Sequence, residues 1–183
     1  HVIAEAVKRA GIEPGEVDDV IIGCAMQQGS SGANIGRTAG VAAGLPSSVA
    51  GMSMDRQCGS GMMAIATAAK QIVCDNMPIV IGGGLESISL VLNEHRNAYR
   101  AQSPNVIAKS EQAYISMLET AEIVSKRYNI SRDQQDEYSL QSQQRTAAAQ
   151  QAGKLDDEIA PLASKMLFTD KETKQQSVHD THL

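Results

Sequence analysis

The sequence predicts an α/β fold with a mainly parallel sheet whose two faces are covered by helices. Three short apolar segments, residues 20–24, 49–54 and 78–84, have the length and the continuous apolar character of strands buried on both faces. Between these segments lie others whose apolar residues recur at helical spacing. Because strands that alternate with helices are joined by right-handed crossovers, the three strands are expected to lie parallel in one sheet.

The first predicted helix spans residues 2–10, where the apolar side chains follow helical spacing. Gly11 follows it as a C-terminal cap, and the proline and glycine at residues 14–15 then form a turn. After the first strand, Asn34 can cap a short helix, rich in glycine and alanine, that extends to Ala43. Both helices are expected to belong to the layers that cover the sheet.

The segment from Cys58 to Val73 is predicted to be a buried helix. Its apolar residues recur at helical spacing, and its only charged residue is Lys70. The strand that follows, residues 78–84, runs into glycines, where the backbone must pass close to another part of the chain.

The composition of the chain changes near residues 87–93. All glycines except Gly153 precede that region, whereas most glutamines follow it. In the second part, residues 117–128 have helical spacing, and Ser131 with Gln134 has the pattern of a capping box for a helix that ends before Gly153. After Gly153 there is little periodicity, and no regular structure is predicted.

Composition and charge argue against several classes of protein. The 183 residues, 42% of them hydrophobic, carry a formal net charge of -5, which gives no reason to expect nucleic acid or an anionic membrane as a partner. No apolar run reaches the length of a transmembrane helix. Cys24, Cys58 and Cys74 lack C-x-x-C spacing, and His179 and His182 lack further ligands, so neither a disulfide framework nor a metal site is expected. A reducing compartment, the cytoplasm or an organellar matrix, is favoured.

Cys58 is the candidate nucleophile, in the segment DRQCGSGMMA. It follows a predicted strand and begins a predicted helix, where free backbone N–H groups and the helix dipole stabilise a thiolate. Gly59 and Gly61 leave room for an acyl group to approach the backbone, and the Cys58 N–H is placed to bind a developing oxyanion. The same pattern also fits an unreactive, buried cysteine at the start of a glycine-rich helix.

Three segments of the first part resemble the N-terminal half of the thiolases, the acetyl-CoA acyltransferase and acetyltransferase family: GANIGRTAGVAAGLP, DRQCGSGMMAIATAAKQI and IVIGGGLESIS. The second part resembles the loop domain of that family over SMLETAEIVSKRYNISRDQQDEYSLQSQQRTAAAQQAGKLDDEIAPL. The resemblance implies a thiolase-like αβαβα layered half with a mixed, mainly parallel sheet over residues 1–86. It also implies an inserted, mostly helical loop domain over residues 87–183, and a chain truncated at both ends.

By this resemblance, Cys58 accepts an acyl group as a thioester from a 3-oxoacyl-CoA or from acetyl-CoA, and coenzyme A removes it. Coenzyme A is then a co-substrate, no cofactor is bound permanently, and a homodimer or homotetramer is expected. The family also uses the histidine of a Gly-His-Pro motif and the cysteine of a Cys-x-Gly motif. Neither motif occurs in this sequence, so the chain alone is predicted to be inactive.

The resemblance also implies an acyl pocket at Met117, where the family has a pocket methionine. Ser116 and Leu118 replace the neighbours that acetoacetyl-CoA-specific members tend to show, which predicts a less restrictive pocket. The alternative is that Met117 only fills a core, which methionine does well.

Two interpretations from other classes remain open. Residues 59–64 fit G-x-G-x-x-A after a strand, and Glu86 lies at the end of the next strand, as in a dinucleotide-binding module. That motif explains neither the thiol nor the second part of the chain. The other interpretation is a noncatalytic assembly module. The reactivity of Cys58 towards an acyl-CoA, compared with that of Cys24 and Cys74, distinguishes it from an enzyme.

Overall fold

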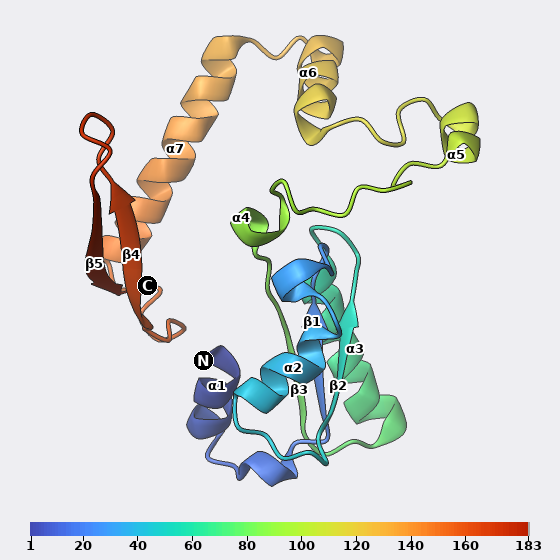
Figure 1. Ribbon diagram of the computed structural model, residues 1–183, viewed down its shortest axis with the longest axis vertical. Helices are drawn as coiled ribbons and strands as arrows, with labels where there is room; N and C mark the ends of the chain where they lie inside the picture. The colour runs from blue at the N-terminus through green and yellow to red at the C-terminus, as the bar shows by residue number, and fades with distance from the viewer. Residues whose placement is uncertain (183) are drawn as a thin grey trace. The chain divides into compact units, whose positions relative to one another are not determined.

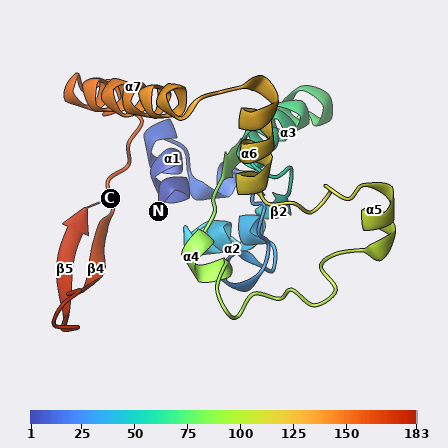
Figure 2. The ribbon, with the colours of Figure 1, turned by 90° about the horizontal axis from the view of Figure 1, so that it is seen from above.

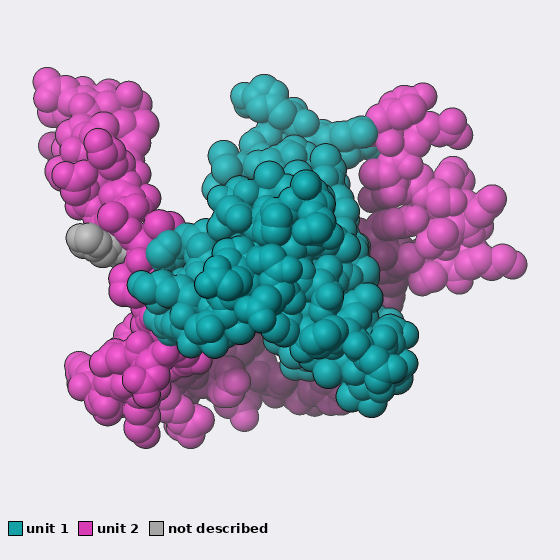
Figure 3. All heavy atoms as spheres, turned by 90° about the horizontal axis from the view of Figure 1, so that it is seen from below, with its two compact units in different colours: residues 1–98 teal, residues 99–183 magenta. Residues whose placement is uncertain are grey.

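The computed structural model describes residues 1–182 (Figure 1). The chain divides into two compact units, His1–Ala98 and Tyr99–Leu183 (Figure 3). The division assigned from the sequence, between residues 86 and 87, follows composition and stays a prediction.

A three-stranded parallel sheet forms the centre of the first unit. Strand β1 (Asp19–Gly23) lies between β2 (Ala50–Met54) and β3 (Val80–Gly84), and both pairings are parallel. Every residue of β1 is buried, as expected for a central strand that is covered on both faces. The prediction of an α/β fold with a mainly parallel sheet is confirmed.

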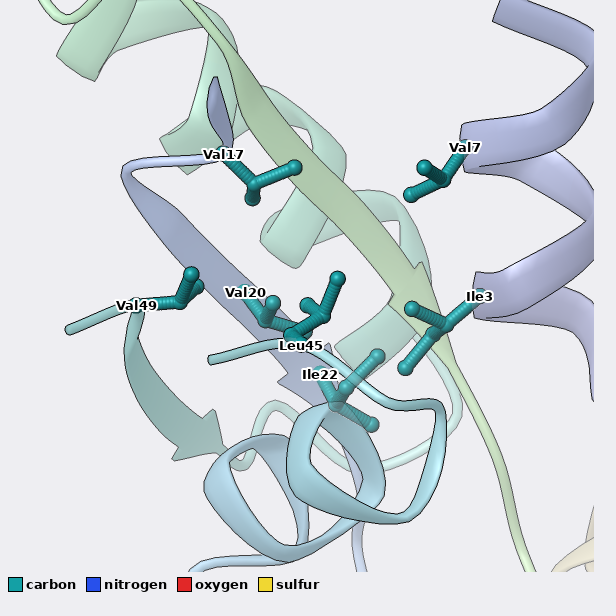
Figure 4. Packing of buried hydrophobic residues seen from close by; sticks show 7 residues of the cluster. All are labelled: Ile3, Val7, Val17, Val20, Ile22, Leu45 and Val49. Carbon is teal, nitrogen blue, oxygen red and sulfur yellow. The ribbon is translucent and has the colours of Figure 1, made fainter. Parts of the chain in front are cut away.

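One face of the sheet packs against α1 (Val2–Ala10) and α2 (Ile35–Ala42). Val20 and Ile22 of β1 point to this face, where they meet side chains from α1 and from the segment that follows α2 (Figure 4). The buried residues of this cluster are Ile3, Val7, Val17, Val20, Ile22, Leu45 and Val49. Both helices begin and end close to the predicted positions, and Asn34 caps α2 through its side chain as expected.

The opposite face of the sheet packs against α3 (Ser60–Asp75). Ile21 of β1 points to this face and contacts Ala64 and Ala68, which lie on one stripe of the helix. The prediction of a buried helix is wrong for the side of α3 away from the sheet, which is exposed: Met62 is 80% and Val73 77% exposed.

The shorter elements of the first unit are two 3-10 helices and one helical turn: η1 (Pro14–Glu16), η2 (Gly29–Ser31) and α4 (Ile88–Val91). The second unit contains α5 (Pro104–Lys109), α6 (Met117–Tyr128), α7 (Arg132–Gln151), β4 (Ala163–Thr169) and β5 (Gln176–His182). Helices α6 and α7 each begin at a serine that forms a capping box, as predicted for α7 from its sequence. None of the helices within residues 1–182 combines the length and the hydropathy of a membrane-spanning segment.

Strands β4 and β5 form an antiparallel hairpin, so the prediction of no regular structure after Gly153 is wrong (Figures 1 and 2). The pairing places Leu167 opposite Val178 on one face and Met166 opposite His179 on the other. Because apolar and polar side chains occur on both faces, the hairpin lacks the alternation that identifies a strand in a sequence.

Candidate active site

The candidate site lies at the carboxyl edge of the parallel sheet. At that edge the Cys24 N–H donates to the Met54 carbonyl at 2.9 Å, and the Leu85 N–H donates to the Gly23 carbonyl at 3.1 Å. The segments that leave the three strands are therefore bonded to one another. In open α/β sheets this edge is where ligands bind.

The segment between β2 and α3, residues 55–60, forms a tight turn, here called the Cys58 turn. The Asp55 carboxylate accepts from the Gln57 N–H at 2.7 Å. The buried Ser60 hydroxyl accepts from the Arg56 N–H at 2.9 Å and donates to the Gln57 carbonyl at 2.6 Å. Gln57 has a φ of 49°, a left-handed conformation that these bonds hold in place. The turn is thus fixed by its own hydrogen bonds.

Cys58 is exposed in this turn. The helix begins at Ser60 with Gly59 as its cap, so the prediction that Cys58 lies in the first helical turn is wrong by two residues. The physical reason is that Gln57 and the Ser60 hydroxyl hold the backbone in the turn up to the cap. Cys58 nevertheless stands next to the N-terminal end of α3, where the helix dipole is positive.

Glycines let the N-terminus of α3 lie directly on the sheet. A β-carbon at Gly23 would come within 2.2 Å of the Ser60 carbonyl carbon, and one at Gly84 within 2.9 Å of the Gly61 α-carbon. Gly23 and Gly84 are therefore needed for packing between helix and sheet, whereas a β-carbon at Gly61 would meet the Gly84 α-carbon at an ordinary 3.6 Å. A β-carbon at Gly59 would meet the Arg56 carbonyl oxygen only at 3.4 Å. That Gly59 and Gly61 also leave room for an acyl group stays a prediction.

The other two cysteines stand in different surroundings. Cys24 is fully buried, and its thiol donates to a Glu86 carboxylate oxygen at 3.3 Å. Burial raises the pKa of the Cys24 thiol, and the hydrogen bond and charge of Glu86 raise it further, so this thiol stays protonated. Cys74 is exposed in the last turn of α3, at the opposite end of the helix from Cys58.

Glu86 is a residue of this edge that the sequence indicated only as part of the dinucleotide-binding alternative, and not as a partner of Cys24. Its carboxylate also accepts from the N–H groups of Ala25 and Met26, at 2.9 and 3.0 Å. Desolvation alone would raise the pKa of Glu86, but the hydrogen bonds from these two N–H groups and from Cys24 outweigh it and lower the pKa. The sequence shows only an acidic residue after a glycine-rich strand, without a sign of the partners that come from after β1.

The match to known proteins decides the family. The family model described as the thiolase N-terminal domain matches residues 1–182. The chain belongs to the thiolase family.

The proteins that resemble the chain along most of its length include curated thiolases and a solved acetyl-CoA acetyltransferase. It is 40% identical to the 3-ketoacyl-CoA thiolase of Bacillus subtilis, over 87% of this chain and 40% of that protein. It is 38% identical to the acetyl-CoA acetyltransferase of Cupriavidus necator, over 88% of this chain and 43% of that protein. The crystal structure of the Bacillus anthracis acetyl-CoA acetyltransferase matches with a TM-score of 0.73 at 39% identity, over 98% of this chain and 46% of that one. The chain thus spans less than half the length of these thiolases.

In this thiolase chain, Ser116 and Met117 lie in the second unit, at the start of α6. The Ser116 hydroxyl accepts from the Glu119 N–H at 3.1 Å, and the Glu119 carboxylate accepts in return from the Ser116 N–H at 2.9 Å. Ser116 therefore caps a helix. Met117 is 75% exposed, so it does not fill a core within its own unit.

Metal ligands are not grouped in the part of the thiolase chain that the structure describes: no three histidine, cysteine or acidic residues there could hold an ion together. His179 lies on β5, where its Nε2 atom is 2.8 Å from the Ser177 hydroxyl oxygen. The side chain of His182, the other histidine considered from the sequence, lies outside the described residues.

Proposed function

We propose that this chain supplies the acyl-accepting cysteine, Cys58, of an enzyme that transfers acyl groups to and from coenzyme A. The observation that carries the proposal is the contrast among the three cysteines. Cys58 is exposed on a hydrogen-bonded turn at the carboxyl edge of the sheet, whereas Cys24 is buried as a protonated donor. Cys74 lies at the other end of α3.

In the direction of cleavage, the Cys58 sulfur attacks the 3-oxo carbon of a 3-oxoacyl-CoA. The bond between carbons 2 and 3 breaks, carbon 2 takes up a proton, and acetyl-CoA leaves while the acyl chain stays on Cys58 as a thioester. The thiol of a second coenzyme A loses its proton, attacks the thioester carbon and releases the shortened acyl-CoA. The reverse sequence condenses two molecules of acetyl-CoA.

The surroundings of Cys58 support the charge changes in these steps. Cys58 lies two residues before the N-terminal end of α3, where the helix dipole is positive. The Cys58 N–H is the proposed donor to the oxygen that becomes negative when the sulfur attacks. Exposure of Cys58 leaves its sulfur accessible to a substrate.

The names of the relatives support acyl-CoA compounds as substrates, and differ in the acyl group. They are a 3-ketoacyl-CoA thiolase, a 3-oxoadipyl-CoA/3-oxo-5,6-dehydrosuberyl-CoA thiolase from Escherichia coli and an acetyl-CoA acetyltransferase. We infer that a pocket near Met117 accepts acyl groups longer than the four-carbon acetoacetyl group. Competition between acetoacetyl-CoA and longer 3-oxoacyl-CoA substrates tests this inference, and a strict preference for acetoacetyl-CoA would contradict it.

The 183-residue chain by itself is proposed not to turn over. The family's Gly-His-Pro and Cys-x-Gly motifs, which move protons to and from the nucleophile and the substrate, have no counterpart in its sequence. Thiolysis of acetoacetyl-CoA is followed with the isolated chain, and sustained turnover at about 1 per second or faster, an ordinary enzyme rate, would contradict the proposal.

The decisive experiment for Cys58 uses the full-length protein and not the isolated 183 residues. The protein is incubated with acetyl-CoA, quenched in acid, weighed by mass spectrometry and mapped by proteolysis. We expect one acetyl group, confined to Cys58, and no adduct in the Cys58→Ala variant. Cys74→Ala is the matched control, since it removes an exposed thiol far from the turn, and it should acetylate as the wild type does. An adduct on Cys24 or Cys74, or none in the wild type, would refute the assignment.

A further inference from the structure

Glu86 joins two segments of the carboxyl edge that are far apart in the chain. Its Oε2 atom accepts from the Ala25 N–H at 2.9 Å, and its Oε1 atom accepts from the Met26 N–H at 3.0 Å and from the Cys24 thiol at 3.3 Å. Glu86 stands two residues after β3, and its three donors follow β1 directly. One carboxylate therefore ties the end of β1 to the end of β3.

The Cys58 turn rests on the first of these strand ends, that of β1. The N–H of Cys24 donates at 2.9 Å to the carbonyl of Met54, the residue that precedes the turn. On the other side of the turn, the first residue of α3 lies so close to Gly23 that a β-carbon there would meet the Ser60 carbonyl at 2.2 Å. We therefore expect a shift at the end of β1 to displace the Cys58 turn.

At neutral pH, the protonation states of Glu86 and Cys24 suit this arrangement. An ionised carboxylate only accepts, so all three donors find an acceptor on Glu86. The hydrogen bonds that lower the pKa of Glu86 keep it ionised, and the raised pKa of Cys24 keeps that thiol a donor. Cys24 thus acts as a link between Glu86 and Met54.

We propose that Glu86 is a positioning residue for acyl transfer at Cys58 and acts through Cys24 and Met54. The inference rests on the proposed function, because it requires Cys58 to accept the acyl group. In a dinucleotide-binding module, the acidic residue at this place binds the ribose of the nucleotide. The carboxylate of Glu86 is instead already bonded within the fold, so its role is a different one.

The Glu86→Gln variant separates positioning from a simple effect of charge. Glutamine has nearly the same size, but its NH2 group cannot accept, so at least one donor after β1 loses its acceptor. If Glu86 positions the turn, acylation of Cys58 slows. If its carboxylate acts on the reaction by charge alone, neutralising it removes a repulsion of the negative charge that develops in acyl transfer, and acylation at neutral pH becomes faster.

The experiment measures the single-turnover rate of Cys58 acetylation by acetyl-CoA, in the polypeptide as the cell makes it. We expect Glu86→Gln to lower the rate at saturating acetyl-CoA by about 10- to 100-fold, with half-saturation at an unchanged concentration. Glu94→Gln is the matched control, because Glu94 is an exposed carboxylate of the same unit whose partner is His95, at 3.6 Å. It should stay within about twofold of the wild type.

Alkylation of Cys74 in the same samples reports on α3 as a whole. An unchanged Cys74 rate in Glu86→Gln, together with slow acetylation of Cys58, is the expected result. An equal or faster acetylation rate in Glu86→Gln would overturn the inference, and so would a slow rate accompanied by a changed Cys74 rate, since that indicates a disturbed helix. A wild-type protein without any adduct on Cys58 would instead overturn the proposed function itself.

Discussion

In the first unit the central strand is buried along its whole length, whereas in the second unit no residue that the structure describes is buried. The helices of the second unit begin and end at short-range signals in the backbone and side chains. Ser116 and Ser131 each close a capping box, and Asn129 and Gly153 adopt the left-handed conformation that ends a helix. The first unit is thus organised by burial of side chains from distant segments, and the helices of the second by signals within a few residues.

The difference predicts how each unit responds to a mutation. Side chains that are packed between a sheet and its helices depend on one another, so removing a central one destabilises the whole unit. The capped helices α6 and α7 contain no buried residue, so the loss of a cap frays only the end that the cap closed. Mutations in the two units, taken in order of their expected effect, test this contrast.

The largest effect is expected for Ile21→Ala. Ile21 is 0% exposed in the middle of β1 and contacts Ala64 and Ala68 of α3. Its truncation leaves a cavity and should lower the free energy of unfolding of the first unit by about 2–5 kcal/mol. Urea denaturation gives the free energy, and amide hydrogen exchange read by mass spectrometry shows where protection is lost: in β1, β3 and α3, and not in α7.

The control for Ile21 is Ile65→Ala, the same change at a position of α3 that is 57% exposed. It should alter the free energy of unfolding by no more than about 0.5 kcal/mol. Faster exchange in α7 of the Ile21→Ala variant would break the comparison between the units, because α7 would then depend on the core of the first unit.

A smaller effect is expected for Ser131→Ala in the second unit. The Ser131 hydroxyl accepts from the Gln134 N–H at 3.2 Å at the start of α7, and its loss costs about 1 kcal/mol of helix stability. Exchange should become faster in the first turn of α7 and stay unchanged in β1. Ser139→Ala is the matched control within the helix: its hydroxyl only bonds back to the Gln135 carbonyl, and alanine favours a helix. Protection in the first turn of α7 that survives Ser131→Ala would show that contacts beyond the cap hold this helix.

The sequence predicted elements of both units wherever one local signal was sufficient. The strands around Ile21 appeared as continuous apolar runs, and α7 was marked by its cap at Ser131 and by Gly153 at its end. The hairpin β4–β5 was missed, because Met166 and Leu167 point to opposite faces and leave no alternation. Local signals cannot reveal a strand that has neither alternation nor a continuous apolar run, and β5 has a single apolar residue, Val178.

The candidate site was predictable only in part. A cysteine between a strand and a helix is visible in the sequence, and the structure places Cys58 there, exposed, although before the helix cap. The bonds of Glu86 to Cys24 and its neighbours join residues 60 to 62 positions apart. Such a contact depends on the order of the strands, β2-β1-β3, which brings the end of β3 beside that of β1.

The smallest effect is expected at Asp170, in the turn of the β4–β5 hairpin. Its Oδ1 atom accepts from the Thr173 N–H at 2.6 Å, from the Thr173 hydroxyl at 2.9 Å and from the Glu172 N–H at 2.9 Å. The Thr173 N–H and hydroxyl, followed by the Glu172 N–H, lower the pKa of Asp170. Since the pKa is lowered in the folded state, the carboxylate stabilises the turn fully above the ordinary pKa of about 4, and this stabilisation is lost as the pH falls through the lowered value.

The titration of the Thr173 amide, followed by NMR between about pH 7 and pH 2, measures this local effect. Its midpoint should lie below that of an unbonded aspartate, and β1 amides should not change with it. Asp170→Asn keeps the accepting oxygen but cannot ionise, so it should remove the transition while the turn persists. A transition that remains in Asp170→Asn would have to come from other groups of the hairpin. The turn would then depend on pairing between the strands, and the second unit would resemble the first more closely than its exposed side chains indicate.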